Sequence, residues 1–185
     1  EDGVPQSRLP GQLHAARGEF EAIQVAVRSR TARRVSLKAE PFGAELPIRV
    51  RTVGRVPITR GTHRTPKEQR VAEPPVDLPD PLFPGDTLEL QADTTDCFWL
   101  DVQVPATTDP GDYRTRIRIS SDGTSIELPL RLHVHQATVP FQGKLLLTNW
   151  FSMRPKELGF GDASPGSDAW FACANLLFDS MWSHR

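Results

Sequence analysis

The stretch CFWLDVQVPATTDPGDYRTRIRISSDGTSIELPLRLHVHQ, residues 97–136, decides the fold class. Apolar and polar side chains alternate through three runs separated by turn residues, which is the pattern of strands with one buried face. The apolar members are Phe98, Leu100, Val102, Val104, Tyr113, Ile117, Ile119, Ile126, Leu128, Leu130, Leu132 and Val134. Asp122 and Gly123 readily supply the positive φ of a tight turn, so the last two runs form a hairpin. The pattern predicts an antiparallel β-sandwich of the immunoglobulin-like or jelly-roll type.

Three earlier segments supply further strands of this sandwich. Residues 18–29, GEFEAIQVAVRS, place Phe20, Ile23, Val25 and Val27 at apolar positions, and the break near Glu21 predicts a bulge. Period-two alternation continues in two more segments, RRVSLKAE at 33–40 and PIRVRTVGRV at 47–56. The sandwich is therefore predicted to span roughly residues 10–138, within a first domain of residues 1–140.

Residues 57–84 contain seven prolines and almost no periodic apolar pattern. We interpret this segment as a long, largely irregular excursion, because a loop of this length usually wraps another element or serves a site. The prolines fix φ and lower the entropy lost on ordering. We therefore expect the segment to be ordered and to lie over a sheet or a neighbouring domain.

The pattern of apolar residues changes after residue 140. The run KLLLTNWF at 144–151 is continuously apolar, as in a strand that is covered on both faces. A helix is then predicted over 167–185, with Ser167 as N-cap and Asp168 in the first turn. Its apolar face comprises Trp170, Cys173, Ala174, Leu177, Met181 and Trp182. Such an apolar helix needs cover, so residues 141–185 are interpreted as the start of a truncated second domain.

Composition excludes some functional classes. A mean hydropathy of −0.39 and no apolar run of about 18 residues argue against a membrane span, so no membrane partner is expected. Residues 28–70 hold twelve Lys and Arg residues against three acids. Arginines recur at every second position in two strands: Arg49 and Arg51, then Arg114, Arg116 and Arg118. This spacing indicates solvent-facing positions, and without interleaved aromatic residues it does not predict a nucleic-acid partner.

No metal site or cofactor is predicted. Cys97 and Cys173 lie in different predicted elements and are interpreted as free thiols, with a disulfide as the alternative. His133 and His135 share one strand face, but no third ligand is evident nearby, so an exposed pair is favoured. A calcium site was weighed for three aspartates, yet their spacing lacks the glycine-anchored pattern of a calcium loop. They are Asp86, Asp93 and Asp96.

The order of several motifs resembles a known enzyme family. They are ARGEFEAIQVAV (16–27), PDPLFPGD (79–86), FWLDVQVPATTDPGDYRTRIRI (98–119), LPLRLHVHQATVP (128–140) and LLLTNWF (145–151). Together they are similar to the N-terminal portion of glycoside hydrolase family 123 and related proteins catalogued as a domain of unknown function. The resemblance implies a β-sandwich followed by a (β/α)8 barrel that removes terminal β-N-acetylgalactosamine. The first strand and first helix of that barrel would then fall within residues 141–185.

The resemblance also implies a substrate-assisted, retaining mechanism, in which the acetamido oxygen of the sugar attacks C1 beside an adjacent Asp-Glu pair. This chain contains no Asp-Glu dipeptide, so no catalytic residue is assigned. Trp150 and Asn149 fall at the carboxyl end of the expected first barrel strand, where barrel sites are built. We interpret them as candidate sugar-binding residues, with filling of the junction between the domains as the alternative for Trp150.

These observations favour a non-catalytic supporting domain of a bacterial glycoside hydrolase in carbohydrate metabolism. Its expected partners are its own C-terminal barrel and a glycan substrate, and the resemblance implies a secreted or periplasmic protein. One alternative is an independent carbohydrate-binding module, although Trp99 is the only tryptophan within the sandwich. Another is a protein-interaction module, which would dock a partner or dimerise through the apolar tail of residues 141–185.

Overall fold

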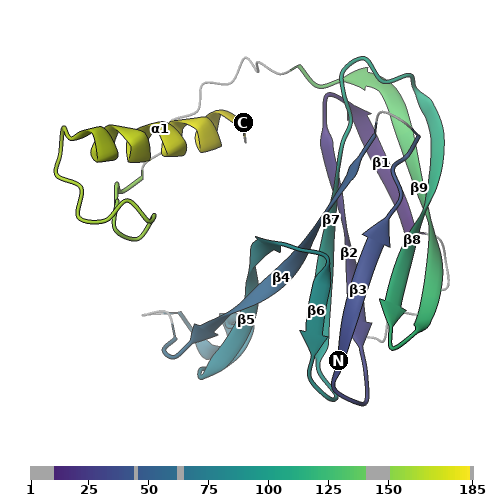
Figure 1. The fold of residues 1–185 in the computed structure, drawn as a ribbon, viewed down its shortest axis with the longest axis horizontal. Coiled ribbons are helices and arrows are strands. Elements are labelled where there is room, and N and C mark those ends of the chain that lie inside the picture. The colour runs from purple at the N-terminus through teal and green to yellow at the C-terminus, as the bar shows by residue number, and fades with distance from the viewer. Residues whose placement is uncertain (1–10, 44–45, 62–64, 141–150, 184–185) are drawn as a thin grey trace. The chain divides into compact units, whose positions relative to one another are not determined.

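The structure is a computed structural model that describes residues 11–43, 46–61, 65–140 and 151–183. The chain divides into two compact units, residues 1–139 and residues 140–185. Each unit is described separately below. The first contains every strand of the described residues, and the second contains the α-helix (Figure 1).

Two β-sheets make up the first unit, in which residues 11–139 carry the strands (Figure 1). Sheet A has five strands, in the order β1 (Gly11–Arg17), β9 (Thr124–Thr138), β8 (Gly111–Ser121), β3 (Arg33–Ala39) and β6 (Thr87–Leu90). Sheet B has four, in the order β2 (Phe20–Arg28), β7 (Thr95–Gln103), β4 (Ile48–Ile58) and β5 (Val76–Pro84). The predicted mainly β sandwich is confirmed.

The predicted alternation on β7, β8 and β9 supplies much of the core. Phe98, Leu100 and Val102 of β7 are fully buried, and Leu130, Leu132 and Val134 of β9 are almost so. They pack in one cluster with buried side chains of the other strands, namely Leu13, Val25, Val35, Leu37, Leu90 and Ile117. The β8–β9 hairpin turns at Asp122 and Gly123, whose φ values of 47° and 76° are those that the Asp-Gly pair predicts.

The prediction that residues 57–84 are largely irregular is wrong for the last third of that segment. Strand β4 extends to Ile58, a short 3-10 helix covers Lys67–Gln69, and β5 pairs antiparallel with β4. The prolines of this segment argued against a strand, because proline has no backbone N–H to donate to the hydrogen-bond ladder of a central strand. Strand β5, however, lies at the edge of sheet B, where a missing backbone donor is tolerated.

The predicted bulge near Glu21 is also wrong. Strand β2 pairs with β7 without a register shift from Phe20 opposite Gln103 to Arg28 opposite Thr95. Phe20 therefore lies on the other face from Ile23 and Val25, and its side chain is 56% exposed.

Strands β1 and β6 were not identified individually from the sequence. Both are short, and β1 pairs parallel with β9, whereas the other paired strands are antiparallel. A parallel partner can come from a distant part of the chain without a local turn signal. In β1, Leu13 and Ala15 are buried in the core, so His14 between them points to the outer face.

In the second unit, α1 (Asp168–Ser183) matches the predicted helix. The Ser167 hydroxyl accepts a hydrogen bond from the Trp170 backbone N–H at 3.3 Å, as expected of an N-cap. Cys173 and Ala174 are buried on the predicted apolar face. The predicted strand at 144–151 lies almost entirely outside the described residues, so a barrel remnant is not established. None of the helices described is both long and apolar enough to cross a membrane.

Candidate functional site

The two predicted sugar-binding residues, Asn149 and Trp150, lie outside the described residues. Their role stays a prediction. Among the described residues, polar side chains line several hollows, including one on each sheet. One lies on the outer face of sheet B and includes Trp99, and the other lies at the end of the β8–β9 hairpin on sheet A.

The hollow on sheet B, here called the Trp99 groove, has a volume of about 580 Å³. It is lined in part by Gln24 from the edge strand β2 and by Cys97 and Trp99 from the neighbouring central strand β7. The Trp99 indole N–H donates to Oδ1 of Asp101, and Nη1 of Arg51 lies 3.2 Å from Oδ2 of the same carboxylate. The Asp101 side chain is only 15% exposed, so its charge is neutralised by an arginine where water screens it little.

A second ion pair lies among the residues that line the Trp99 groove. Arg55 donates from Nη2 and Nε to Oδ1 of Asp96, at 2.8 and 3.1 Å. Arg55 and Asp96 lie on β4 and β7. The rest of the lining is largely uncharged, and it includes Trp99, Cys97 and Gln24 beside apolar side chains. An aromatic side chain beside hydrogen-bonding groups is an arrangement that binds the apolar face of a sugar ring.

The three aspartates weighed for calcium are separated by their partners. Asp96 is paired with Arg55, Asp93 lies 4.0 Å from Arg28, and Asp86 accepts a hydrogen bond from the Thr87 hydroxyl at 2.9 Å. The structure does not bring them together.

Cys97 and Cys173 are both free thiols, as predicted. Partial burial raises the pKa of the Cys97 thiol, against a smaller lowering by a backbone hydrogen bond at Val25. Its sulfur lies 3.8 Å from Oε1 of Gln24. A raised pKa keeps this group protonated near neutral pH, so it does not have the character of an activated nucleophile.

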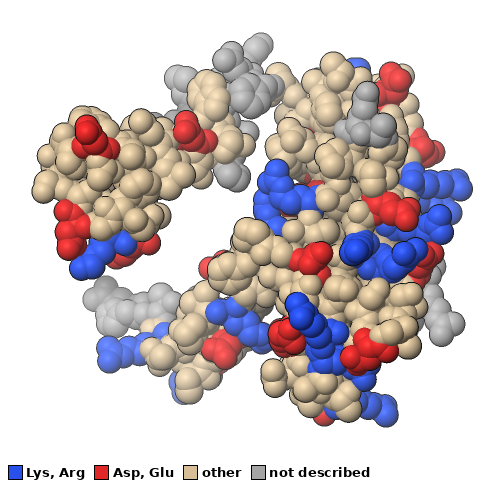
Figure 2. Space-filling view, viewed as in Figure 1, with Lys and Arg blue, Asp and Glu red and all other residues tan. Residues whose placement is uncertain are grey.

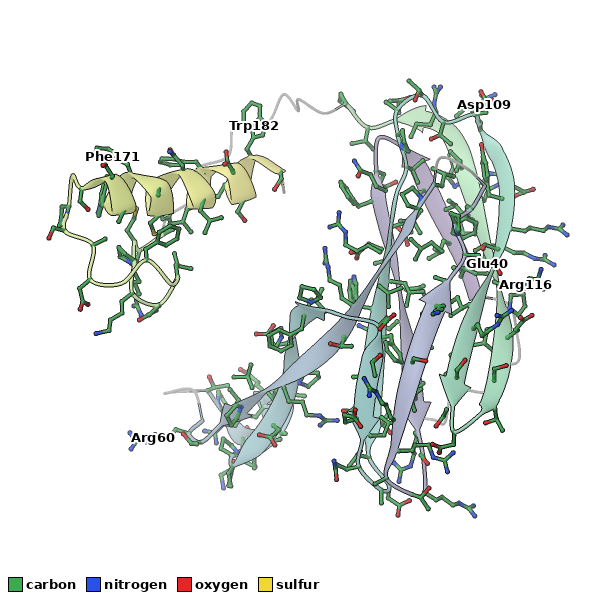
Figure 3. The ribbon with its side chains drawn as sticks, viewed as in Figure 1. Glu40, Arg60, Asp109, Arg116, Phe171 and Trp182 are labelled. Carbon is green, nitrogen blue, oxygen red and sulfur yellow. The ribbon has the colours of Figure 1, made fainter. Side chains whose placement is uncertain are left out.

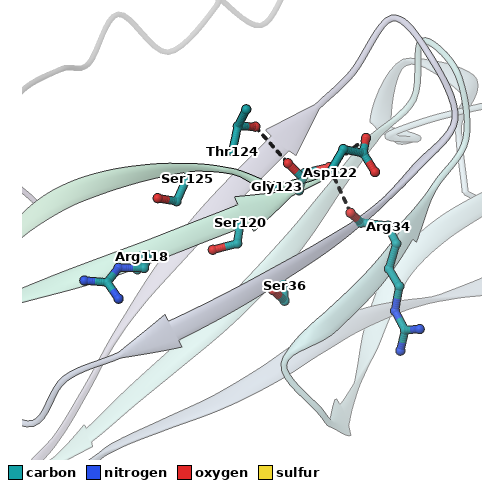
Figure 4. A pocket seen from close by; sticks show the side chains of 9 residues that line it. Arg34, Ser36, Arg118, Ser120, Asp122, Gly123, Thr124 and Ser125 are labelled. Atoms are coloured by element: carbon teal, nitrogen blue, oxygen red, sulfur yellow. Dashed lines mark hydrogen bonds between the residues drawn. The ribbon is translucent and has the colours of Figure 1, made fainter.

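The hollow on sheet A has a volume of about 490 Å³ (Figure 4). Ser36, Ser120 and Ser125 lie opposite one another on β3, β8 and β9, and form a row of short hydroxyl side chains. Arg34 and Arg118 stand beside this row, and the hollow exists because serines are much shorter than the arginines around them. Hydroxyl groups on an open surface can hydrogen-bond a polar ligand, and Asp122 is a carboxylate among the residues that line the hollow.

The arginines of β8 are exposed at every second position, as predicted, and contribute to the charged surface visible in Figure 2. Arg116, labelled in Figure 3, and Arg118 both bond to Glu127, at 3.2 and 2.7 Å. Hydrogen bonds from Arg118 and Arg116 lower the pKa of the Glu127 carboxyl. Much of the basic character is therefore balanced locally by carboxylates.

Sequence reasoning missed one member of a histidine group. His14 on β1 lies directly opposite His133 on β9, so three imidazoles gather where a pair was predicted. His133 Nδ1 lies 2.8 Å from Oδ1 of Asp112, and this hydrogen bond lowers the pKa of the Asp112 carboxyl. The parallel pairing of β1 with β9 was the missing signal.

The pKa shifts of Asp112 and Glu127 run opposite to the shift of a glycosidase general acid. A general acid in such an enzyme needs a raised pKa, whereas Asp112 and Glu127 are both shifted downward. Ten carboxylates of the described residues, among them Asp96, Asp101 and Glu127, form ion pairs with arginine, lysine or histidine.

Comparison with solved structures identifies relatives of the fold. Part of this chain is similar to part of a family 123 glycoside hydrolase from Clostridium perfringens, whose description concerns glycolipid glycan hydrolysis. The TM-score is 0.53 at 16% sequence identity, and the match covers 73% of this chain but 24% of the hydrolase. At this identity the similarity shows a shared sandwich fold. This chain spans about a quarter of the length of that enzyme.

Two further likenesses are weaker. They are the PapD-like domain 7 of human CEP192, at a TM-score of 0.36 and 10% identity, and the CooA pilin subunit of enterotoxigenic Escherichia coli, at 0.31 and 11%. They cover 72% of this chain and 93% and 94% of those chains. Neither score carries an argument about function. A scan of family models and a search of curated proteins found no match.

Proposed function

We propose that this chain is a supporting β-sandwich of a glycoside hydrolase of the family 123 type, with the catalytic residues in a following domain. The observation that carries the proposal is the match to the family 123 enzyme, which covers 73% of this chain and 24% of the hydrolase. In that enzyme the matched region is a minor part of a much longer chain. The substrate would be a glycan with a terminal β-N-acetylgalactosamine, and the protein would act outside the cytoplasm.

The second unit supports this proposal independently. Phe171, Leu176 and Phe178 of α1 are 53%, 49% and 55% exposed (Figure 3 labels Phe171). Phe171 and Phe178 lie on one side of the helix and Leu176 on another, and large apolar side chains on two sides are unusual on a solvent-exposed surface, because each costs free energy while it faces water. Further strands and helices of a following domain would cover them, since the helices of a (β/α)8 barrel pack against the sheet and one another.

The test is an activity comparison. The 185-residue chain and the product of its whole reading frame are purified and incubated with an aryl β-N-acetylgalactosaminide, and the released phenol is followed by absorbance. We expect hydrolysis by the longer product and none by the 185-residue chain. A reading frame that stops at Arg185, or a longer product without N-acetylhexosaminidase activity, would contradict the proposal.

The Trp99 groove favours a second candidate function, that of a carbohydrate-binding module. The groove combines a partly exposed indole with the side chains of Gln24 and Arg55, which can donate to sugar hydroxyls. Binding of an oligosaccharide to residues 1–185 in a glycan array, lost in a Trp99→Ala variant, would establish it. The control is Trp182→Ala, which removes a tryptophan of the other unit. Equal binding by both variants would rule out the groove.

A further inference from the structure

Three histidines form a cluster on the outer face of sheet A. His14 comes from β1, and His133 and His135 come from β9 two positions apart, so all three project from the same face. Their ring centroids lie 5.7 Å apart for His14 and His133, 5.7 Å for His14 and His135, and 4.6 Å for His133 and His135. These three residues are called the histidine cluster below.

The spacing of the rings suits a shared transition-metal ion. Zinc binds imidazole nitrogen at about 2.0–2.1 Å in tetrahedral geometry, which places the centres of two zinc-bound rings about 5 Å apart. The three separations in the histidine cluster lie on both sides of that value. Neutral imidazole is also a preferred ligand of zinc, copper and nickel.

Asp112 provides an independent observation that points to the same ligand. Its Oδ1 lies 2.8 Å from Nδ1 of His133, which leaves Nε2 of that ring available. Histidines that bind metals commonly donate their other ring N–H to a carboxylate, which fixes the tautomer and the orientation of the ring. Asp112 lies opposite His133 on β8, so the arrangement is held by the strand register.

The rings must reorient before they can bind an ion. Among the described residues, no group of three metal-ligating side chains is placed so that it could hold a metal ion without a change of conformation. The planes of the His14 and His135 rings lie at 26° to each other, in a stacked arrangement. His14 and His135 are exposed, and the His133 side chain is 39% exposed. Exposed side chains change rotamer within nanoseconds, so reorientation meets little steric resistance.

The charged side chains near the histidine cluster have opposite effects on the binding of a cation. Arg114 and Arg131 lie directly opposite each other on β8 and β9, one step along each strand's outer face from Asp112 and His133. Their positive charges oppose a cation, whereas the Asp112 carboxylate favours it. If the arginines dominate, the same surface would bind an anion such as phosphate. The experiment must therefore distinguish the two.

We propose that His14, His133 and His135 bind one zinc ion on the outer face of sheet A, with Asp112 orienting the His133 ring. The fourth position would hold water or a ligand oxygen, because three protein ligands leave a tetrahedral ion open. The sheet supplies two neighbouring strands at fixed register, which sets the spacing of all three ligands.

The test is calorimetric titration of the metal-free 185-residue chain with zinc chloride at about pH 7.5, where imidazole is mostly neutral. We expect one equivalent of zinc to bind. The zinc affinity should fall at least tenfold in His14→Gln and in His135→Gln, because each variant removes a metal ligand, and loss of an outer partner alone commonly costs tenfold or more. The matched control is a His63→Gln/His184→Gln double variant, which removes the two histidines outside the cluster and should keep the affinity. Unfolding curves without metal show that each variant is folded.

Asp112→Asn tests the orienting role separately. We expect it to weaken zinc binding roughly 10- to 100-fold while one equivalent still binds. The proposal is overturned if zinc shows no saturable binding, if it binds equally well to His14→Gln, or if the double control abolishes it. It is equally overturned if inorganic phosphate binds at this surface and zinc does not.

Discussion

At the scale of single residues, burial follows the parity of each position along its strand. Phe98 is fully buried, and Phe20 is 56% exposed although it was predicted to face inward. Alternation fixed the faces of β7, β8 and β9 because their apolar residues share one parity without interruption. It failed at Phe20, since an unbroken register puts that residue on the opposite face from Ile23.

This difference predicts unequal costs of two matched substitutions. Phe98→Ala leaves a cavity in the core and should lower the free energy of unfolding by about 3–5 kcal/mol. Phe20→Ala removes the same side chain from a largely exposed position and should change it by about 0.5 kcal/mol. Urea denaturation of the 185-residue chain, followed by tryptophan fluorescence, measures both. Similar losses for the two variants would show that the register of β2 is misassigned.

The ion pairs of Glu127 predict a dependence on pH. Because hydrogen bonds from Arg118 and Arg116 lower the pKa of this carboxyl in the folded chain, it contributes stability above its ordinary value of 4.5. That contribution is lost as the pH falls through the lower folded value. Glu127→Gln should therefore be less stable than the parent chain at about pH 7, and the difference should shrink at about pH 3.

Urea midpoints at the two pH values measure this effect. Glu89→Gln is the matched control, because its carboxylate lies on the same sheet, 3.4 Å from Arg34, with both side chains about 70% exposed or more. We expect a smaller change in the control, since exposed single pairs contribute little. A difference for Glu127→Gln that is the same at both pH values would contradict the assignment.

At the scale of elements, strands that pair through a local turn were predictable and strands that pair at a distance were not. The Asp122–Gly123 turn signal predicts the β8–β9 hairpin. No comparable signal links β1 to β9, and that pairing is what brings His14 to His133. Edge position explains why proline-rich β5 was missed, because an edge strand needs only one row of backbone partners.

The turn between β1 and β2 gives a prediction at this scale. Gly18 has a φ of 80°, and an added Cβ would lie 2.4 Å from the carbonyl oxygen of Val139. Gly123 has a similar φ of 76° but no atom within 4 Å of that position. Gly123→Ala should cost roughly 1–2 kcal/mol from the left-handed conformation alone, and Gly18→Ala should cost more.

Thermal unfolding of the two variants compares these costs directly. The excess loss in Gly18→Ala measures the crowding where the β1–β2 turn meets the end of the first unit. A Gly18→Ala chain as stable as Gly123→Ala would show that the turn relaxes away from Val139.

At the scale of the whole molecule, the alternating pattern predicted a fold of mainly β class, which the two sheets confirm. The first unit ends at Val139. The candidate sugar-binding pair could not be assessed, since Asn149 and Trp150 lie outside the described residues. The histidine cluster needed the three-dimensional pairing of strands, whereas Trp99 was evident as the single tryptophan of the sandwich.

If the sandwich has the proposed supporting role, it stabilises the catalytic domain of the complete protein and takes no part in catalysis. Kinetic measurements distinguish a supporting role from a catalytic one. Loss of a stabilising domain shortens the half-life of the activity, whereas loss of a catalytic residue lowers the initial rate of the reaction. The comparison needs an enzyme lacking residues 1–139 and the intact product of the reading frame.

The most direct measurement is the half-life of N-acetylgalactosaminidase activity for these two proteins at one elevated temperature. We predict that the intact product retains activity several times longer, while Trp99→Ala and Cys97→Ser variants keep the same initial rate. Equal half-lives with and without the sandwich, or loss of the initial rate in either variant, would contradict the account.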